Sequence, residues 1–298
     1  MARKRDIVIG VIIGLSFLVA IVFFGLIFLA AMFPGDDVTL AGFGEKVAVI
    51  DVYGTIYNSE NVVRQLKKYG RAGNIDAVVL HINSPGGGVA PSQEIYNEIL
   101  RVRDEEGKIV VVSMGSMAAS GGYLIACAAD KIVANPGTMT GSIGVIISFP
   151  TAGKLFEKIG IAYETVKSGE LKDVGTMDRR MTENERKMLT SVIMDTYEQF
   201  VDIVCEGRGL EREEVYRLAN GSIFTGRQAY TMNLVDTLGG FEDAIRIAAD
   251  MAGISGEPGI IKERDPQPSI WDLMGSFMGK VENLAGSEVG GPSVMYLY

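Results

Sequence analysis

The sequence is organised around residues 115–123, which read Gly115-Ser116-Met117-Ala118-Ala119-Ser120-Gly121-Gly122-Tyr123. Ser120 stands between an alanine and a Gly-Gly pair, so little side-chain bulk surrounds its hydroxyl. The glycines permit a sharp turn and expose amide N–H groups. The apolar run after them predicts a buried helix over 123–129, whose N-terminus favours negative charge developing beside it. Taken alone, a serine beside glycines is more typical of a simple turn, and Ser120 becomes a candidate nucleophile only together with an oxyanion hole and a base.

Composition limits the function classes. The chain has 298 residues, of which 47% are hydrophobic, enough for a packed core. Its net charge is -9 and no basic cluster occurs beyond residue 10, which argues against nucleic acid as the main partner. Two cysteines and one histidine match no metal-ligand spacing, so we expect no metal and no other cofactor. Cys127 is predicted to be a small core residue, with a Cys127–Cys205 disulfide as the alternative in an extracytoplasmic domain.

The N-terminal segment has the pattern of a membrane anchor. Ala2 is followed by three basic residues at 3–5, and no charged residue occurs from Ile7 to Gly35. That span is longer than the apolar core of a cleaved signal peptide and long enough to cross a bilayer. We predict a cell-membrane protein with a cytoplasmic N-terminus, a single transmembrane helix and an extracytoplasmic catalytic domain, with cleavage of the anchor as the minor alternative. The predicted segments are 1–6 (cytoplasmic), 7–34 (anchor) and 35–45 (linker).

Strands and helices alternate through the middle of the chain. Apolar β-rich runs predict strands, and amphipathic runs of about ten residues predict helices. Their alternation predicts an α/β domain over 46–255, with a parallel sheet covered by helices. A tail rich in Gly, Pro and Ser follows at 256–298. The predicted strands are 46–53, 76–83, 108–113, 131–134 and 144–148, and the predicted helices are 59–69, 93–102, 182–208, 211–219, 225–232 and 241–252.

A second glycine-rich stretch, Ser84-Pro85-Gly86-Gly87-Gly88, directly follows a predicted strand. Taken alone, such a stretch is equally typical of a simple loop. At the carboxyl end of a parallel strand, however, it lies where ligands enter open α/β sheets. An oxyanion hole needs N–H donors held about 3 Å from the developing charge. The amides of Gly87 and Gly121 are our candidate donors.

A serine nucleophile also needs a base. His81 lies inside a predicted strand, where histidines are usually packed, so a Ser-His-Asp arrangement is the weaker alternative. Lysine is the remaining base, and a free lysine, with a pKa of about 10.4, has to be desolvated to act as one. Lys172 follows a β-like run at 162–167 and lies outside any amphipathic helix. Asp173 beside it would favour the charged amine unless its carboxylate points away.

Four motifs occur in an order that resembles one protease family. They are Ile82-Asn-Ser-Pro-Gly-Gly-Gly88, Ala118-Ala-Ser-Gly-Gly-Tyr123, Thr140-Gly-Ser-Ile-Gly-Val145 and Ser168-Gly-Glu-Leu-Lys-Asp173. Together the set resembles the signal peptide peptidase A family in its short, membrane-anchored form, over about residues 46–255. The first motif alone also resembles Clp-type proteases and the wider crotonase-like fold. The resemblance therefore implies a Clp/crotonase-like α/β fold with repeated ββα units.

The resemblance also implies a role for each matching residue. Ser120 matches the nucleophile and Lys172 the general base. Ser142 matches a serine that hydrogen-bonds the lysine amine and orients it, and Gly87 and Gly121 match the oxyanion-hole amides. The implied activity is that of a serine endopeptidase that degrades released signal peptides and other apolar peptides. The implied assembly is a homo-oligomeric ring, commonly octameric, with the active sites facing inward.

Three other functions share part of this pattern. A related membrane Ser-Lys protease that clips apolar tails of partner membrane proteins would have the same dyad. A membrane scaffold with a crotonase-like fold and no catalysis would not need Ser120, Ser142 and Lys172 together. An acyl-CoA enzyme would use the same glycines, but the sequence has no evident basic cluster for the CoA phosphates.

The apolar end of the tail, Met295-Tyr-Leu-Tyr298, suggests one further hypothesis. It follows a stretch rich in glycine, and it would occupy an apolar substrate groove of its own chain or be trimmed by the enzyme itself. A loose chain end or an oligomer contact is the alternative.

Overall fold

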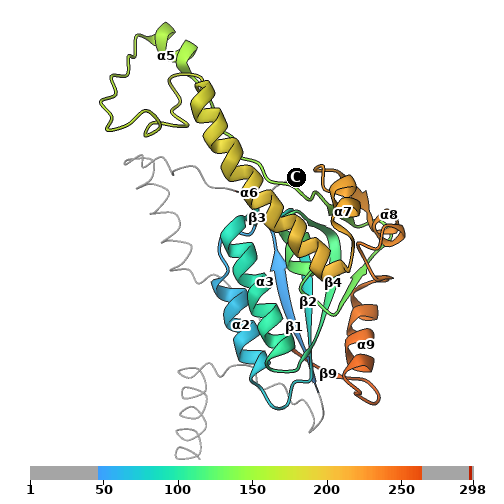
Figure 1. Cartoon of the computed structure of the whole chain (residues 1–298). Coiled ribbons are helices and arrows are strands. Elements are labelled where there is room, and N and C mark those ends of the chain that lie inside the picture. Colours follow the sequence, from blue (N-terminus) through green and yellow to red (C-terminus); the bar gives the residue numbers. More distant parts are fainter. Residues whose placement is uncertain (1–45, 264–294, 297–298) are drawn as a thin grey trace, which may run out of the picture. The chain divides into compact units, whose positions relative to one another are not determined.

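An eight-stranded mixed sheet forms the centre of the computed structural model, which describes residues 46–263 and 295–296 (Figure 1). The predicted cytoplasmic segment, anchor and linker lie outside these residues, as does most of the predicted tail. The strand order is β7-β6-β4-β2-β1-β9, and β5 pairs with β4 and β8 beside this path. The strands of this sheet are β1 (Lys46–Tyr53), β2 (Ala77–Ser84), β4 (Ile109–Ala119), β5 (Lys131–Ala134), β6 (Met139–Gly141), β7 (Ile223–Thr225), β8 (Thr237–Leu238) and β9 (Gly259–Lys262).

The sequence predicted a parallel sheet, but the sheet is mixed, because β7 pairs with β6 in the antiparallel direction. The other strand pairs of this sheet are parallel. A second, two-stranded sheet joins β3 (Gly87–Gly88) to β10 (Met295–Tyr296), also antiparallel. Among the strands of two to four residues, the sequence predicted β5 alone, because so short a run rarely shows a detectable alternation.

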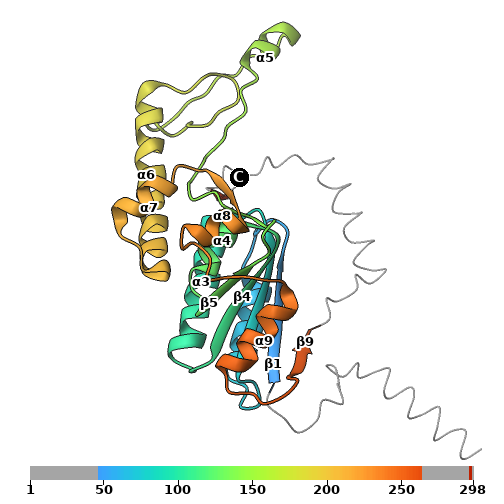
Figure 2. The same ribbon diagram turned by 90° about the vertical axis from the view of Figure 1, so that its right-hand side faces the viewer.

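Helices cover both faces of the sheet (Figures 1 and 2). Alternate residues of β1 point to opposite faces, so Ala48 and Ile50 belong to one buried cluster and Val47 and Val49 to the other. The first cluster includes side chains of α2 (Glu60–Gly70), α3 (Val89–Asp104), α4 (Gly121–Ala126) and α6 (Glu183–Arg208). The second includes α9 (Phe241–Met251). The shorter helices are α5 (Gly153–Ile159), α7 (Arg212–Leu218) and α8 (Gly226–Thr231).

Strand β4 is longer than the run 108–113 that its sequence predicted. It changes partner along its length, pairing with β5 over Val111–Met114 and with β6 over Met117–Ala119. Between the two halves, Gly115 lies close to Asn83, whose Oδ1 accepts a hydrogen bond from the Met117 amide at 3.2 Å. Small residues and glycine have low strand propensity, so only the three-dimensional pairing shows that the strand continues to Ala119.

Three other predictions, two strands and the Ser59 cap of the helix at 59–69, are wrong in detail. The strand predicted at 144–148 is absent, and the local strand is β6 at 139–141. Residues 162–167 form no strand either, because they belong to an extension of the domain instead of the sheet. The Ser59 hydroxyl does not cap α2 but donates to Glu94. By contrast, Thr182 and Glu185 form the capping box that their spacing predicts at the start of α6.

Residues 149–182 form this extension, which includes α5 and lies beyond the N-terminal end of α6 (Figures 1 and 2). Its two arms meet where the Ala152 amide donates to the Met177 carbonyl at 2.7 Å. Gly175, at a φ of 82°, packs so closely against Phe149 that a side chain there would overlap the ring. Several apolar residues of the extension are exposed, Val166 to 96%.

Cys127 is buried beneath α6, and both Cys127 and Cys205 are free thiols, so the alternative disulfide is not formed. Burial raises the pKa of the Cys127 thiol to about 12, which is typical of an inert core cysteine.

Across 46–263 and 295–296, no helix combines the length and apolar character needed to cross a membrane.

Replacing Gly207 of α6 by alanine is expected to destabilise the protein. Alanine normally stabilises a helix relative to glycine by about 1 kcal/mol. Here a Cβ would overlap the backbone carbonyl of Cys127, which cannot move away as a side chain can. We expect the free energy of unfolding to fall by about 1–3 kcal/mol in urea titrations of Gly207→Ala. The matched control, Ser191→Ala on an exposed position of the same helix, should change it by less than about 0.5 kcal/mol; a stabilising Gly207→Ala would contradict the packing described.

Candidate active site

Ser120 occupies a tight turn between β4 and α4. Its φ of 53° and ψ of -119° are rare for a residue other than glycine. The Ser120 amide donates to the Gly141 carbonyl at 2.8 Å, and the Leu124 amide donates to the Ser120 carbonyl at 2.9 Å, which fixes the turn. Ser120 is fully buried, and its Oγ has no hydrogen-bond partner among the described residues. A strained residue with an unpaired buried hydroxyl is unfavourable for stability alone, so it indicates a functional position.

The Gly87 amide lies beside this turn. Ile56 bonds to the residues on either side of Gly87, donating to the Gly86 carbonyl at 2.9 Å and accepting from the Gly88 amide at 2.8 Å. The N–H and C=O of Gly87 therefore face the opposite edge of β3. A Cβ at Gly121 would lie 3.3 Å from the Gly87 nitrogen, and one at Gly87 would overlap the Ile56 backbone. Both glycines are required by close backbone approach, and the two predicted oxyanion donors are brought together.

Two buried serines hold the glycine-rich loop in this position. The Ser84 Oγ accepts a hydrogen bond from the Gly86 amide at 3.1 Å, and the Ser92 Oγ donates to the Gly88 carbonyl at 2.8 Å. A Cβ at Gly121 would also lie 2.5 Å from the Ser92 Oγ, so Ser92 packs directly under the turn. The sequence analysis did not single out Ser92. Its only local signal is its position four residues after Gly88 at the start of α3, which suits a hydroxyl-to-carbonyl bond.

Ser142 lies next to Ser120 because β4 and β6 end side by side. Ala119 pairs with Gly141, so each serine directly follows the last paired residue of its strand. Ser142 also has a positive φ, 51°, and its amide donates to the Ser222 carbonyl at 2.7 Å. It is almost fully buried and contributes to the wall of a cavity of about 500 Å³. The apolar side chains of that wall are Val145, Ile146, Ile193, Met194, Tyr197 and Ala219.

Lys172 is not brought to Ser120 within one chain. It lies in the turns of the extension and is exposed, with its amide donating to the Gly169 carbonyl at 3.2 Å. Its amine makes no ion pair or hydrogen bond with the part of the chain that the structure describes, and the Ser120 hydroxyl is likewise without a partner there. The extension that carries Lys172 lies beyond the far end of α6 from the contact between α6 and α4 (Figures 1 and 2). Four of the five predicted site residues therefore gather at one place and the fifth lies elsewhere.

His81 does not contact Ser120 either. Its ring stacks on Phe241 with 4.7 Å between centroids, and its Nδ1 lies 2.8 Å from the Tyr53 hydroxyl. Burial lowers the pKa of His81, although Asp51, whose Oδ1 lies 3.8 Å from Nδ1, acts in the opposite direction. The packed role that the sequence favoured for His81 agrees with these contacts.

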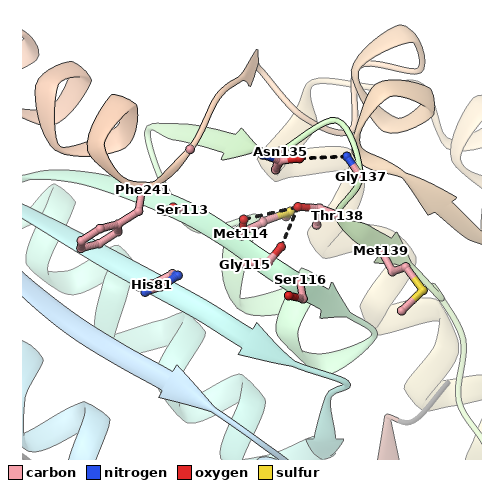
Figure 3. Close-up of a pocket in the computed structure, with 11 residues that line it drawn as sticks. His81, Ser113, Met114, Gly115, Ser116, Asn135, Gly137, Thr138, Met139 and Phe241 are labelled. Carbon is pink, nitrogen blue, oxygen red and sulfur yellow. Dashed lines mark hydrogen bonds between the residues drawn. The ribbon is translucent and has the colours of Figure 1, made fainter.

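His81 lines a different cavity, of about 550 Å³, on the face of the sheet that α9 covers (Figure 3). Thr138 on its wall donates to the Gly115 carbonyl at 2.6 Å, which joins the loop before β6 to the middle of β4. Ser120, Gly87 and Gly121 do not line this cavity. Within residues 46–263 there is also no group of three or more His, Cys, Asp or Glu side chains placed to hold a metal ion.

Comparison with known proteins adds to this geometry. Residues 103–255 match the model of peptidase family S49, and residues 45–141 match the Clp protease model, which supports the Clp-like α/β fold expected for that part. A provisionally named protease of Synechocystis sp., slr0021, is 40% identical over 233 residues, covering 78% of this chain and 83% of that protein. A provisionally named signal peptide peptidase SppA of Enterococcus faecium is 34% identical over 284 residues, covering 82% and 80%.

Two further matches cover smaller shares of this chain. Protease 4 of Haemophilus influenzae is 36% identical over 215 residues, which cover 69% of this chain and 35% of that longer protein. Among solved structures, a ClpP1 mutant from Listeria monocytogenes has a TM-score of 0.46 and 19% identity, covering 66% of this chain and 93% of that chain. Given the match to the family model over half the chain, this protein belongs to peptidase family S49, as a serine peptidase of the SppA and protease 4 group.

Proposed function

We propose that this protein is a membrane-anchored serine endopeptidase with a Ser-Lys dyad, which degrades released signal peptides and other apolar peptides. The observation that carries the proposal is the buried, unpaired hydroxyl of Ser120 on a strained turn beside the amides of Gly87 and Gly121. The apolar cavity next to Ser142 supports a preference for apolar side chains. The uncharged segment at 7–34 supports an anchor in the cell membrane, with the catalytic domain outside the cytoplasm.

In this proposal, Lys172 of a second copy of the chain acts as the base for Ser120. The Ser120 hydroxyl has no partner among residues 46–263, and Lys172 is exposed on an extension with several exposed apolar side chains. Inserting this extension into a neighbouring subunit would cover its apolar surface and desolvate the amine, which a basic lysine requires. Ser142, beside Ser120, is then placed to orient the incoming amine. A closed ring satisfies every subunit in the same way, since each gives its extension to one neighbour and receives one from the other.

The chemistry follows from these positions. The neutral amine of Lys172 takes the proton from Ser120 Oγ as that oxygen attacks the peptide carbonyl. The negative charge that develops on the carbonyl oxygen is stabilised by the amides of Gly87 and Gly121. Protonated Lys172 then donates its proton to the leaving amine as the C–N bond breaks. Water, activated by the same lysine, hydrolyses the acyl-enzyme and regenerates Ser120.

The backbone pairing of β10 supports a mode of substrate binding. Met295 pairs with Gly88 and Tyr296 with Gly87, antiparallel, so a peptide strand lies along β3 at the candidate oxyanion site. Peptides that add a strand to a sheet edge are held by main-chain hydrogen bonds, independently of their sequence. We infer that substrates bind β3 in this extended form and that the end of the tail competes with them.

Alanine variants test the activity and the dyad. The full-length chain in detergent would be assayed on a panel of apolar fluorogenic peptides, beside Ser120→Ala, Lys172→Ala and His81→Ala. Loss of the nucleophile or of the base should lower kcat/KM by about 10³-fold or more, whereas His81→Ala should retain activity. Retained activity in Lys172→Ala with loss in His81→Ala would refute the base assignment. An assembled parent protein that cleaves no peptide would favour the non-catalytic scaffold, and a peptide ranking limited to membrane-protein tails would favour the tail-clipping protease.

Deleting residues 285–298 tests the role of the tail. If the tail occupies the β3 edge, its removal frees the substrate strand position, and we expect KM for short apolar peptides to fall by about 2–10-fold with kcat nearly unchanged. Adding the peptide Met295-Tyr-Leu-Tyr298 to the truncated enzyme should inhibit it competitively. Steady-state constants that stay the same after truncation would show that the tail does not compete with substrate.

A further inference from the structure

We propose that Arg179, together with Lys167, holds the Asp173 carboxylate away from the amine of Lys172 and so keeps that amine available as a base. The inference rests on the catalytic role proposed for Lys172. It makes Arg179 a positioning residue, because it acts through Asp173 and does not touch the reacting atoms.

Both oxygens of the Asp173 carboxylate are engaged by cations other than Lys172. Its Oδ1 lies 2.5 Å from Lys167 Nζ, and its Oδ2 lies 2.9 Å from Arg179 Nη2. These bonds, the one from Lys167 first, lower the pKa of Asp173 to about 2, so the carboxylate is charged at neutral and alkaline pH. Lys172, the neighbouring residue, makes no ion pair within residues 46–263. The carboxylate that adjoins the proposed base in the sequence is thus neutralised by two other cations.

Arg179 in turn is fixed to the start of α6. Its guanidinium donates to Glu185 through Nη1 at 2.9 Å and through Nη2 at 2.5 Å, a two-pronged contact that fixes the plane of the group. The Glu185 side chain is only 1% exposed and also accepts from the Thr182 amide at 2.8 Å in the capping box. Arg179 lowers the pKa of Glu185 to about 2, with the Thr182 amide as the second cause. The loop that carries Lys172 is therefore attached to the end of a 26-residue helix.

Three charged side chains around the loop make further contacts. Lys167 donates to the Glu170 carbonyl at 2.9 Å, which closes the turn before Lys172. The Glu170 carboxylate accepts from Asn184 of α6 at 2.9 Å, and Asp178 accepts from the Thr176 hydroxyl. None of these contacts involves the Lys172 amine, so Asp173 is the carboxylate whose release would affect it most directly.

An unrestrained Asp173 would stabilise the protonated form of the adjacent amine, because an opposite charge within about 4–6 Å favours the charged state. The base would then remain protonated to a higher pH. The consequence is a shift in the acidic limb of the pH profile of kcat/KM, which reports the ionisation of the free enzyme. A purely structural role for Arg179 would lower activity at all pH values and leave that limb in place.

The test compares pH profiles of full-length variants. In Arg179→Gln we expect the acidic limb to move up by about one pH unit, with about tenfold loss of kcat/KM at neutral pH and an alkaline plateau within about twofold of the parent. Asp173→Asn in the same chain as Arg179→Gln restores the parent's net charge at this site and should return the limb to its original pH. Arg179→Lys, which keeps a cation facing Asp173, should remain close to the parent.

Two further variants complete the design. Lys167→Gln removes the other partner of Asp173 without touching Glu185, so it should shift the limb upward even if Arg179→Gln fails to fold. Arg212→Gln is the matched control, because Arg212 also joins two carboxylates, Glu198 and Asp202, but at the other end of α6. It should leave the profile unchanged.

The outcomes separate this inference from the proposed function. The positioning role alone would be overturned if Lys172→Ala is inactive but the acidic limb of the kcat/KM profile stays in place in both Arg179→Gln and Lys167→Gln. A double variant that stays shifted would also overturn it, since the effect would then not act through Asp173. Full activity in Lys172→Ala would instead overturn the catalytic role of the lysine.

Discussion

The hydrogen bond from the Ser120 amide to the Gly141 carbonyl is the contact on which the site depends. It joins the ends of β4 and β6, where Ser120 has a positive φ and Ser142 lies next to it. The remaining features follow from the close packing around this turn. Gly87 and Gly121 have no room for a side chain, and Ser84 and Ser92 supply the hydrogen bonds that hold the glycine-rich loop against it. The serine, the donors and the neighbouring serine thus form one rigid unit.

That unit contains the proposed nucleophile and the proposed oxyanion donors, but no base. The Ser120 hydroxyl is buried and unpaired, while Lys172 is exposed on an extension whose apolar residues are also exposed. Both features are explained if the extension is buried against another subunit. That contact would supply a base to the subunit that receives the extension, and it would cover the apolar surface of the subunit that provides it. On this account assembly creates the catalytic centre. An unassembled subunit would be inactive, which would protect other proteins until assembly is complete.

The sequence predicted the parts of the structure that local chemistry determines. The long apolar strands, the helices and the capping box at Thr182 follow from periodicity and spacing, and the glycine-flanked Ser120 and the loop at Gly87 follow from the need for close backbone approach. It missed what depends on pairing between distant residues. Strand β4 continues to Ala119 because β6 pairs with Met117–Ala119 and β2 pairs again at Ala118. Likewise, no local pattern indicates that Asp173 pairs with Lys167 and Arg179 instead of with its neighbour Lys172.

Subunit mixing tests the central claim most directly. Ser120→Ala and Lys172→Ala subunits would be dissociated, mixed in equal amounts, reassembled and assayed together. If each site takes its serine and its lysine from different chains, random mixing should restore roughly a quarter of the parent's activity, although each variant alone is inactive. A mixture that assembles into rings of the parent's size and stays inactive would contradict a shared site and place both residues of the dyad in one chain.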